Sequence, residues 1–236
     1  MKKGDLKKRE IIKTAETLFC RNGYETTSVQ DILDILHTSK GSFYHHFASK
    51  ELLLEEICRE RANIVAEKVN ETIKNDEDPL ININKVFSGM MPLTGEKLSF
   101  LMMILPVFDL PEGRQIRYGY AESLESAFLD TAIREIIRGN EKEEFCCNDA
   151  GHTANICFII LNELWYRICL TILKNEKSGK DTDPAVLLGQ IEHFRATIER
   201  LLSAPFGSIK LLNLDDIKFL ADQIHYHWKL HHFGGQ

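Results

Sequence analysis

Several patterns that mark other classes of protein are missing from these 236 residues. No run shows the apolar–polar alternation of a β-strand, and no segment repeats. The patterns GxSxG, HExxH, GxGxxG and GxxxxGK[ST] are absent. Their absence argues against common hydrolases, zinc proteases and nucleotide-binding folds. We therefore expect an all-α protein that is not an enzyme and needs no cofactor and no metal.

The pattern of cysteines and the composition of the N-terminus indicate the cellular compartment of the protein. The six cysteines form no CxxC pair, which is typical of free thiols in a reducing environment. The charged N-terminus lacks the apolar core of a secretory signal peptide, so we expect no such peptide and a cytoplasmic protein. The most apolar run, residues 154–173, is about as long as a membrane span. Asn155, Asn162, Glu163 and Arg167 interrupt it, so we interpret it as a buried bundle helix and expect no membrane contact.

The charge is distributed unevenly along the chain. The formal net charge is −6, which argues against a generic nucleic-acid binder. Residues 1–50 nevertheless carry nine Lys and Arg against six Asp and Glu, whereas the remaining residues are strongly acidic. A basic end on an acidic body indicates two tasks and two partners.

Helical periodicity runs through nearly the whole chain, with Gly and Pro at the joints. The expected helices cover approximately residues 5–22, 28–36, 39–45, 50–75, 80–91, 95–109, 113–139, 150–176, 184–204 and 214–230.

Two of these helices are short and are joined by a tight turn. Thr27-Ser28-Val29-Gln30 fits a capping box for the helix at 28–36, and Ser39 can cap the next one. Two such helices within a three-helix cluster form a helix-turn-helix, here at about residues 28–47. Its second helix enters the major groove of DNA by its N-terminal end.

The stretch TSKGSFYHHFASK, residues 38–50, has the composition that this geometry requires. Small residues allow a close approach to base edges, and the hydroxyls and Lys40 can form hydrogen bonds there. Tyr44, His45 and Lys50 suit phosphates, as does the helix start at Thr27. Phe43 and Phe47 would anchor the helix to its neighbours. The candidate DNA-binding residues are Thr27, Thr38, Ser39, Lys40, Gly41, Ser42, Tyr44, His45 and Lys50.

About fifty N-terminal residues resemble the TetR (tetracycline repressor) family of bacterial regulators. The resemblance implies a DNA-binding domain, residues 1–60, followed by a helical effector-binding and dimerisation domain, residues 61–236. One departure lies in the turn, which is Leu36-His37-Thr38-Ser39 where the family usually has Ala-Gly-Val-Ser, so we expect strain at His37. The matching positions are Ala15, Leu18-Phe19, Gly23-Tyr24, Thr26-Thr27, Val29, Asp31-Ile32, Ser39-Lys40-Gly41, Phe43-Tyr44, His46-Phe47 and Ser49-Lys50-Glu51.

No motif stands out beyond residue 60. The resemblance implies an effector pocket among the middle helices and a homodimer through about residues 150–176 and 184–204, which their apolar faces permit. Met and aromatic side chains line adaptable apolar cavities, although ordinary core packing is the favoured interpretation of each residue taken separately. No charged anchor is obvious, so we expect an apolar or amphipathic effector. The candidate pocket residues are Phe100, Met103, Phe108, Tyr120, Trp165 and Tyr166.

Two groups of potential ligands leave metal or redox sensing open. Adjacent cysteines are poorer zinc ligands than a CxxC pair, and an apolar stripe on the last helix favours simple docking. The first group is Cys146, Cys147, His152 and Cys157, and the second is His225, His227, His231 and His232.

These patterns together predict a sequence-specific DNA-binding transcriptional regulator. From the family resemblance, we expect a repressor that a small-molecule effector releases from a palindromic operator. The alternative is a helical interaction protein that has lost specific DNA binding. We keep this alternative because His37 is an unusual residue in the turn.

Overall fold

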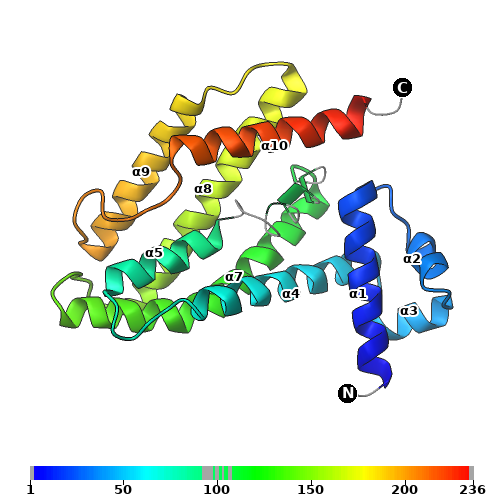
Figure 1. Cartoon of the computed structure of the whole chain (residues 1–236), viewed down its shortest axis with the longest axis horizontal. Helices are drawn as coiled ribbons and strands as arrows, with labels where there is room; N and C mark the ends of the chain where they lie inside the picture. Colours follow the sequence, from blue (N-terminus) through cyan, green and yellow to red (C-terminus); the bar gives the residue numbers. More distant parts are fainter. Residues whose placement is uncertain (1–2, 92–97, 99–100, 103, 106–107, 234–236) are drawn as a thin grey trace. The chain divides into compact units, whose positions relative to one another are not determined.

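The computed structural model describes the chain except residues 1–2, 92–97, 99–100, 103, 106–107 and 234–236 (Figure 1). Every regular element in the described part is a helix, which confirms the all-α prediction. The expected helix at 95–109 lies largely outside the described residues. The helices are α1 (Lys3–Asn22), α2 (Val29–Ile35), α3 (Lys40–His46), α4 (Lys50–Asn70), α5 (Pro79–Met90), α7 (Pro111–Glu141), α8 (Ala150–Ser178), α9 (Pro184–Leu202) and α10 (Leu214–Phe233).

The chain divides into two compact units. The first comprises Met1–Ile64 and Thr94–Ser123, and the second comprises Val65–Leu93 and Leu124–Gln236. Helices α4 and α7 each contribute residues to both units. The first unit therefore holds the whole segment that the sequence assigns to DNA binding.

An aromatic centre holds the helices of the first unit together. Phe19 of α1 and Phe43 of α3 are fully buried. The Phe19 ring meets Tyr24 edge-on at 5.1 Å, and the rings of Phe43 and Phe47 lie 5.9 Å apart. Such pairs add to the free energy gained by burying their area, so α3 is anchored from its inner side.

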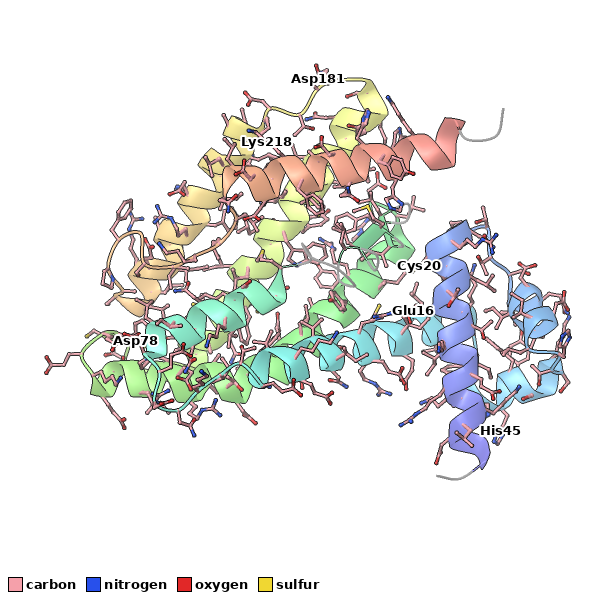
Figure 2. The ribbon with its side chains drawn as sticks, viewed as in Figure 1. Glu16, Cys20, His45, Asp78, Asp181 and Lys218 are labelled. Atoms are coloured by element: carbon pink, nitrogen blue, oxygen red, sulfur yellow. The ribbon has the colours of Figure 1, made fainter. Side chains whose placement is uncertain are left out.

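Ion pairs connect α1 with α4 in the same unit. Lys8 Nζ lies 2.6 Å from Glu56 Oε1. Glu16, in the middle of α1, pairs with Arg61 (Figure 2). Both pairs are partly buried, so solvent screens them less than a pair on an open surface.

The second unit is built around α8. Figure 1 shows α10 crossing α8 and α9 at an oblique angle, and it contacts both; α5 also contacts α8. Helix α8 is the one described helix that is long and apolar enough to cross a membrane, and half of its most apolar stretch is buried. Phe158, Leu161, Leu164 and Ile168 form its inner face and are fully buried. This packing supports the interpretation of residues 154–173 as a bundle helix.

A buried polar network in the second unit holds the connection between α4 and α5. Glu135 of α7 is fully buried and pairs with Arg138. Asn82 Nδ2 donates to Glu135 Oε2 at 3.0 Å and to the Lys74 carbonyl at 2.9 Å, and Arg138 donates to the Glu77 carbonyl at 2.8 Å. Removing one member of such a network leaves the others buried without partners, which costs several kcal/mol.

Candidate DNA-binding site

The start of α2 is determined by a capping box. The Ser28 hydroxyl accepts a hydrogen bond from the Asp31 N–H at 3.2 Å, and the Ser28 N–H donates to Asp31 Oδ2 at 2.7 Å. Hydrogen bonds from the Ser28 backbone and side chain lower the pKa of the Asp31 carboxyl. The predicted box at Thr27 and Gln30 was therefore wrong by one residue. Thr27 is fully buried, and its hydroxyl donates to the Gly23 carbonyl at 2.8 Å instead.

The turn between α2 and α3 forms with a left-handed residue. His37 has φ +46°, a left-handed conformation that accounts for the strain expected there. The His37 N–H donates to the Asp34 carbonyl at 3.4 Å, and the Thr38 N–H donates to the Leu33 carbonyl at 3.1 Å. These two bonds are those of a Schellman motif, which favours glycine at the left-handed position. The histidine therefore adopts the turn at a conformational cost.

Helix α3 presents its polar first turn to solvent. Ser39 caps it, because the Ser39 hydroxyl accepts from the Ser42 N–H at 3.3 Å. Phe43 is buried on the inner side and Tyr44 is 55% exposed. The predicted contact residues Ser39, Lys40, Gly41, Tyr44 and His45 are exposed, and Thr38 and Ser42 are half-buried.

Gly41 is not needed for packing within the protein. A Cβ added there would meet only the Ser39 hydroxyl, at 3.8 Å, which is an ordinary contact. Glycine weakens a helix by about 1 kcal/mol relative to alanine, and packing within the protein does not account for this cost. Close approach of another molecule to the exposed backbone of α3 would account for it.

Two histidines end α3. The rings of His45 and His46 lie 5.0 Å apart, and His45 is exposed near the end of the helix (Figure 2). Burial lowers the pKa of His46, and the neighbouring His45 and Lys8 lower it further. His46 is therefore less readily charged at neutral pH than an ordinary histidine, which leaves Lys40 as the fixed positive charge of α3.

Thr27 and Lys50, both predicted to contact phosphates, have hydrogen-bond partners within the protein. The Lys50 ammonium donates to the carbonyls of Tyr24 and Thr27 at 2.9 and 3.1 Å. It also lies 4.1 Å from the centroid of the Tyr24 ring. The Thr27 N–H donates to the Tyr24 carbonyl at 3.3 Å. Both residues thus hold the segment before α2 through contacts within the protein. The pattern of polar residue types gave no sign of these long-range partners.

One exposed residue was missed at the start of α2. Gln30 occupies the first turn of the helix, and its amide donates to Asp34 Oδ1 at 2.7 Å. With the cap at Ser28, Gln30 is the second residue of α2, the helix that crosses the DNA backbone in helix-turn-helix complexes.

The six candidate effector residues fall in different parts of the chain. Phe100 and Met103 lie outside the described residues. Phe108 and Tyr120 are buried in the first unit, where burial raises the pKa of the Tyr120 hydroxyl. Trp165 is buried in the second unit, and Tyr166, beside it in sequence, is half-buried.

The structure adds a charged neighbour that sequence reasoning missed. Trp165 Nε1 donates to Asn162 Oδ1 at 3.2 Å, and Asn162 Nδ2 donates to Glu125 Oε1 at 2.6 Å. A polar chain thus leads from α7 to the tryptophan of α8.

Two cavities in the described part are lined by residues other than the predicted effector residues. One of about 390 Å³ lies in the first unit between Lys8, Phe47 and Arg59. The other, of about 420 Å³, lies in the second unit between α9 and the connection to α10.

The two candidate metal or redox groups contain free cysteines and histidines that lie beside carboxylates. All six cysteines are free thiols, and no group of three or more His, Cys, Asp or Glu side chains in the described part could hold a metal ion. His152 Nδ1 lies 3.0 Å from Asp149, and His225 Nδ1 lies 2.8 Å from Glu176. The structure does not describe the side chains of His231 and His232.

A short polar helix, held from behind by buried aromatics and preceded by a capped helix and a tight turn, defines a helix-turn-helix protein. Residues 11–57 match the family model described as bacterial regulatory proteins, tetR family. The transcriptional regulator QacR of Staphylococcus aureus is 37% identical over 165 residues, covering 66% of this chain and 82% of QacR. The chain belongs to the TetR family.

Other similar proteins match different shares of the chain. The uncharacterised regulator YerO of Bacillus subtilis is 31% identical over 127 residues, covering 51% of this chain. The chain spans 43% of the length of YerO. The crystal structure of RolR in complex with resorcinol has a TM-score of 0.57 at 14% identity and covers 92% of this chain and 94% of RolR. At that identity the likeness concerns the fold.

Proposed function

We propose that this chain is a sequence-specific DNA-binding transcriptional regulator that represses its target genes in the cytoplasm. The observation that carries the proposal is the exposed first turn of α3 on a fully buried Phe43, within the family match at residues 11–57. Residues 1–60 would form the DNA-binding domain. Direct contacts would come from Thr38, Ser39, Lys40, Gly41, Ser42, Tyr44 and His45, and Thr27 and Lys50 would support them.

A homodimer suits this reading of DNA. One helix of seven residues contacts few base pairs, whereas two copies related by a two-fold axis read a palindrome. The outer faces of α8 and α9, in the proposed interface at residues 150–176 and 184–204, carry exposed aliphatic side chains. Ile156 is 43% exposed, Ile159 is 62% exposed and Val186 is 57% exposed.

The effector would act from the domain formed by residues 61–236. We favour an apolar or amphipathic small molecule, since buried aromatics such as Trp165 lie beside the polar pair of Asn162 and Glu125. RolR was solved with resorcinol, a small aromatic of this character. Effector binding would favour a dimer whose two α3 helices no longer match successive half-sites. DNA and effector would therefore weaken one another's binding by the same factor.

The test is binding of the purified protein to duplex DNA from directly upstream of its own gene, with a scrambled duplex as competitor. Specific regulators bind about 10³-fold or more tightly to their site than to other DNA. A selection from random DNA covers the case of a distant operator. The proposal is wrong if no sequence is enriched, and the chain is then the interaction protein that we consider as the alternative.

Matched variants test the assigned face. Lys40→Met should weaken DNA binding and lower the preference for the specific duplex, since one hydrogen-bond donor to a base edge is lost per protomer. Lys218→Met removes an exposed lysine of α10, on a different unit, and should leave DNA binding unchanged (Figure 2). If the two changes had equal effects on DNA affinity, α3 would not be part of the DNA-binding site.

A further inference from the structure

Lys50 occupies a position that disfavours its charge. It is the first residue of α4, where the helix macrodipole places partial positive charge and favours anions. The following residue, Glu51, fits this preference: hydrogen bonding to Ser49 and to its own N–H lowers its carboxyl pKa. A lysine at this end of a helix therefore requires specific partners that offset the unfavourable field.

The partners of Lys50 lie within the protein. The ammonium donates to the carbonyls of Tyr24 and Thr27, at 2.9 and 3.1 Å, and the Tyr24 ring lies 4.1 Å away. An ammonium has three donors and no acceptor. The two carbonyls and the face of the Tyr24 ring provide one partner for each of the three N–H donors. The Lys50 side chain is half-buried.

These partners sit at the start of the helix-turn-helix. Thr27 directly precedes the Ser28 cap of α2, and the Tyr24 ring is packed against Phe19 in the core. Lys50 thus ties the segment before α2 to the beginning of α4, and α2 in turn sets the place of α3. Loss of the ammonium would leave the Thr27 carbonyl without its charged donor.

We propose that Lys50 is a positioning residue that locks the start of α2 and acts on DNA binding through the placement of α2 and α3, without neutralising a phosphate. The proposal rests on the proposed DNA-binding function. Its structural half, the lock itself, can be measured without DNA.

The salt dependence of binding separates a positioning residue from a phosphate contact. Each phosphate neutralised contributes about 0.9 to the slope of log K against log salt, so a dimer that loses two lysine contacts loses about 1.8. The probe is a duplex recovered by the full-length protein from a random DNA pool. Affinity is measured across a salt series for wild type, Lys50→Met and Lys40→Met, with Lys218→Met as the unaffected control.

The expected pattern differs between the two lysines. Lys50→Met should lower affinity about tenfold at every salt concentration, as expected for hydrogen bonds from a charged donor, with the slope unchanged. Lys40→Met should lower the preference for the specific duplex over scrambled DNA, as expected for a base contact. A slope that falls by about 1.8 for Lys50→Met would overturn the proposal, because the ammonium would then neutralise phosphates.

Amide hydrogen exchange of the free protein tests the lock directly. Peptides covering residues 23–30 should exchange about tenfold faster in Lys50→Met and at the wild-type rate in Lys40→Met. Unchanged exchange in Lys50→Met would refute the lock, whatever happens to DNA affinity. If no duplex is enriched, the proposed function fails, while the exchange result still decides whether Lys50 holds the start of α2.

A milder variant covers the case in which Lys50→Met does not fold. Lys50→Arg keeps the positive charge, which a phosphate contact would tolerate, but its planar guanidinium does not reproduce an ammonium between two carbonyls and a ring. The lock predicts faster exchange at residues 23–30 and lower affinity with an unchanged slope. Wild-type rates of amide exchange and wild-type DNA affinity in Lys50→Arg would contradict the proposed lock.

Discussion

Gly139, in the last turns of α7, has no room for a side chain. A Cβ added there would lie 2.0 Å from Cδ2 and 2.5 Å from Cε2 of Phe145, whereas carbon atoms pack best at about 3.5–4.0 Å. Phe145 is 3% exposed. Its N–H donates to the Gly139 carbonyl at 3.2 Å, and the next N–H, of Cys146, donates to the Leu202 carbonyl at 2.9 Å. The ring therefore cannot move away together with its backbone.

Two opposing effects set the consequence of Gly139→Ala. Alanine favours the helix by about 1 kcal/mol over glycine. Against this, a displaced Phe145 loses its burial, and the loss of a buried phenylalanine costs about 3–5 kcal/mol. We expect the free energy of unfolding to fall by about 2–4 kcal/mol, the difference between the two effects.

Gly119 provides the matched control on the same helix. A Cβ at this position meets nothing within 4 Å, so Gly119→Ala should raise the free energy of unfolding by about 1 kcal/mol. Denaturant unfolding followed by far-UV circular dichroism measures both variants. A Gly139→Ala protein as stable as wild type would refute the reasoning, because the ring of Phe145 would then have space that the structure does not show.

Three further changes test other features. His37→Gly should raise the free energy of unfolding by about 1 kcal/mol by relieving the left-handed residue, and a less stable variant in denaturant unfolding would contradict the strain at φ +46°. Burial and the nearby Asp78 raise the pKa of Glu144. Because the folded pKa lies above the unfolded one, stability is lost as pH rises through it. Glu144→Gln should therefore be more stable than wild type at neutral pH and equal to it near pH ~4, and a gap that widens on acidification would show the sign to be wrong. Ile159→Glu should weaken the proposed dimer in sedimentation equilibrium, whereas Ile137→Glu, at an exposed position of α7, should not. Equal effects of the two changes on dimerisation would show that α8 does not form the interface.

Much of the helical architecture follows from signals close together in the chain. The apolar period and the Gly and Pro breakers predict nearly every described helix, because periodicity and breakers act within a few residues. The same holds for the cap at Ser39 and the strained turn at His37. Helix α4 ends at Asn70, earlier than the predicted 75, since tight turns at Thr72 and Ile73 follow it.

The roles of Thr27 and Lys50 depended on tertiary contacts. From the chain alone, both are polar residues at helix starts, which is the pattern of a phosphate site. Thr27 is buried, and the capping box is formed by Ser28 instead. The carbonyls that accept hydrogen bonds from Lys50 belong to residues 24 and 27, more than twenty positions away in sequence.

The sequence by itself determined the all-α class, the helix-turn-helix and the outward polar turn of α3, because each depends on short-range periodicity, capping and residue type. Only the tertiary structure decided which polar side chains remain available for a partner. Packing brings distant carbonyls, carboxylates and rings within hydrogen-bond reach, and a donor so engaged, like that of Lys50 or Asn162, is committed to the protein's own backbone or side chains.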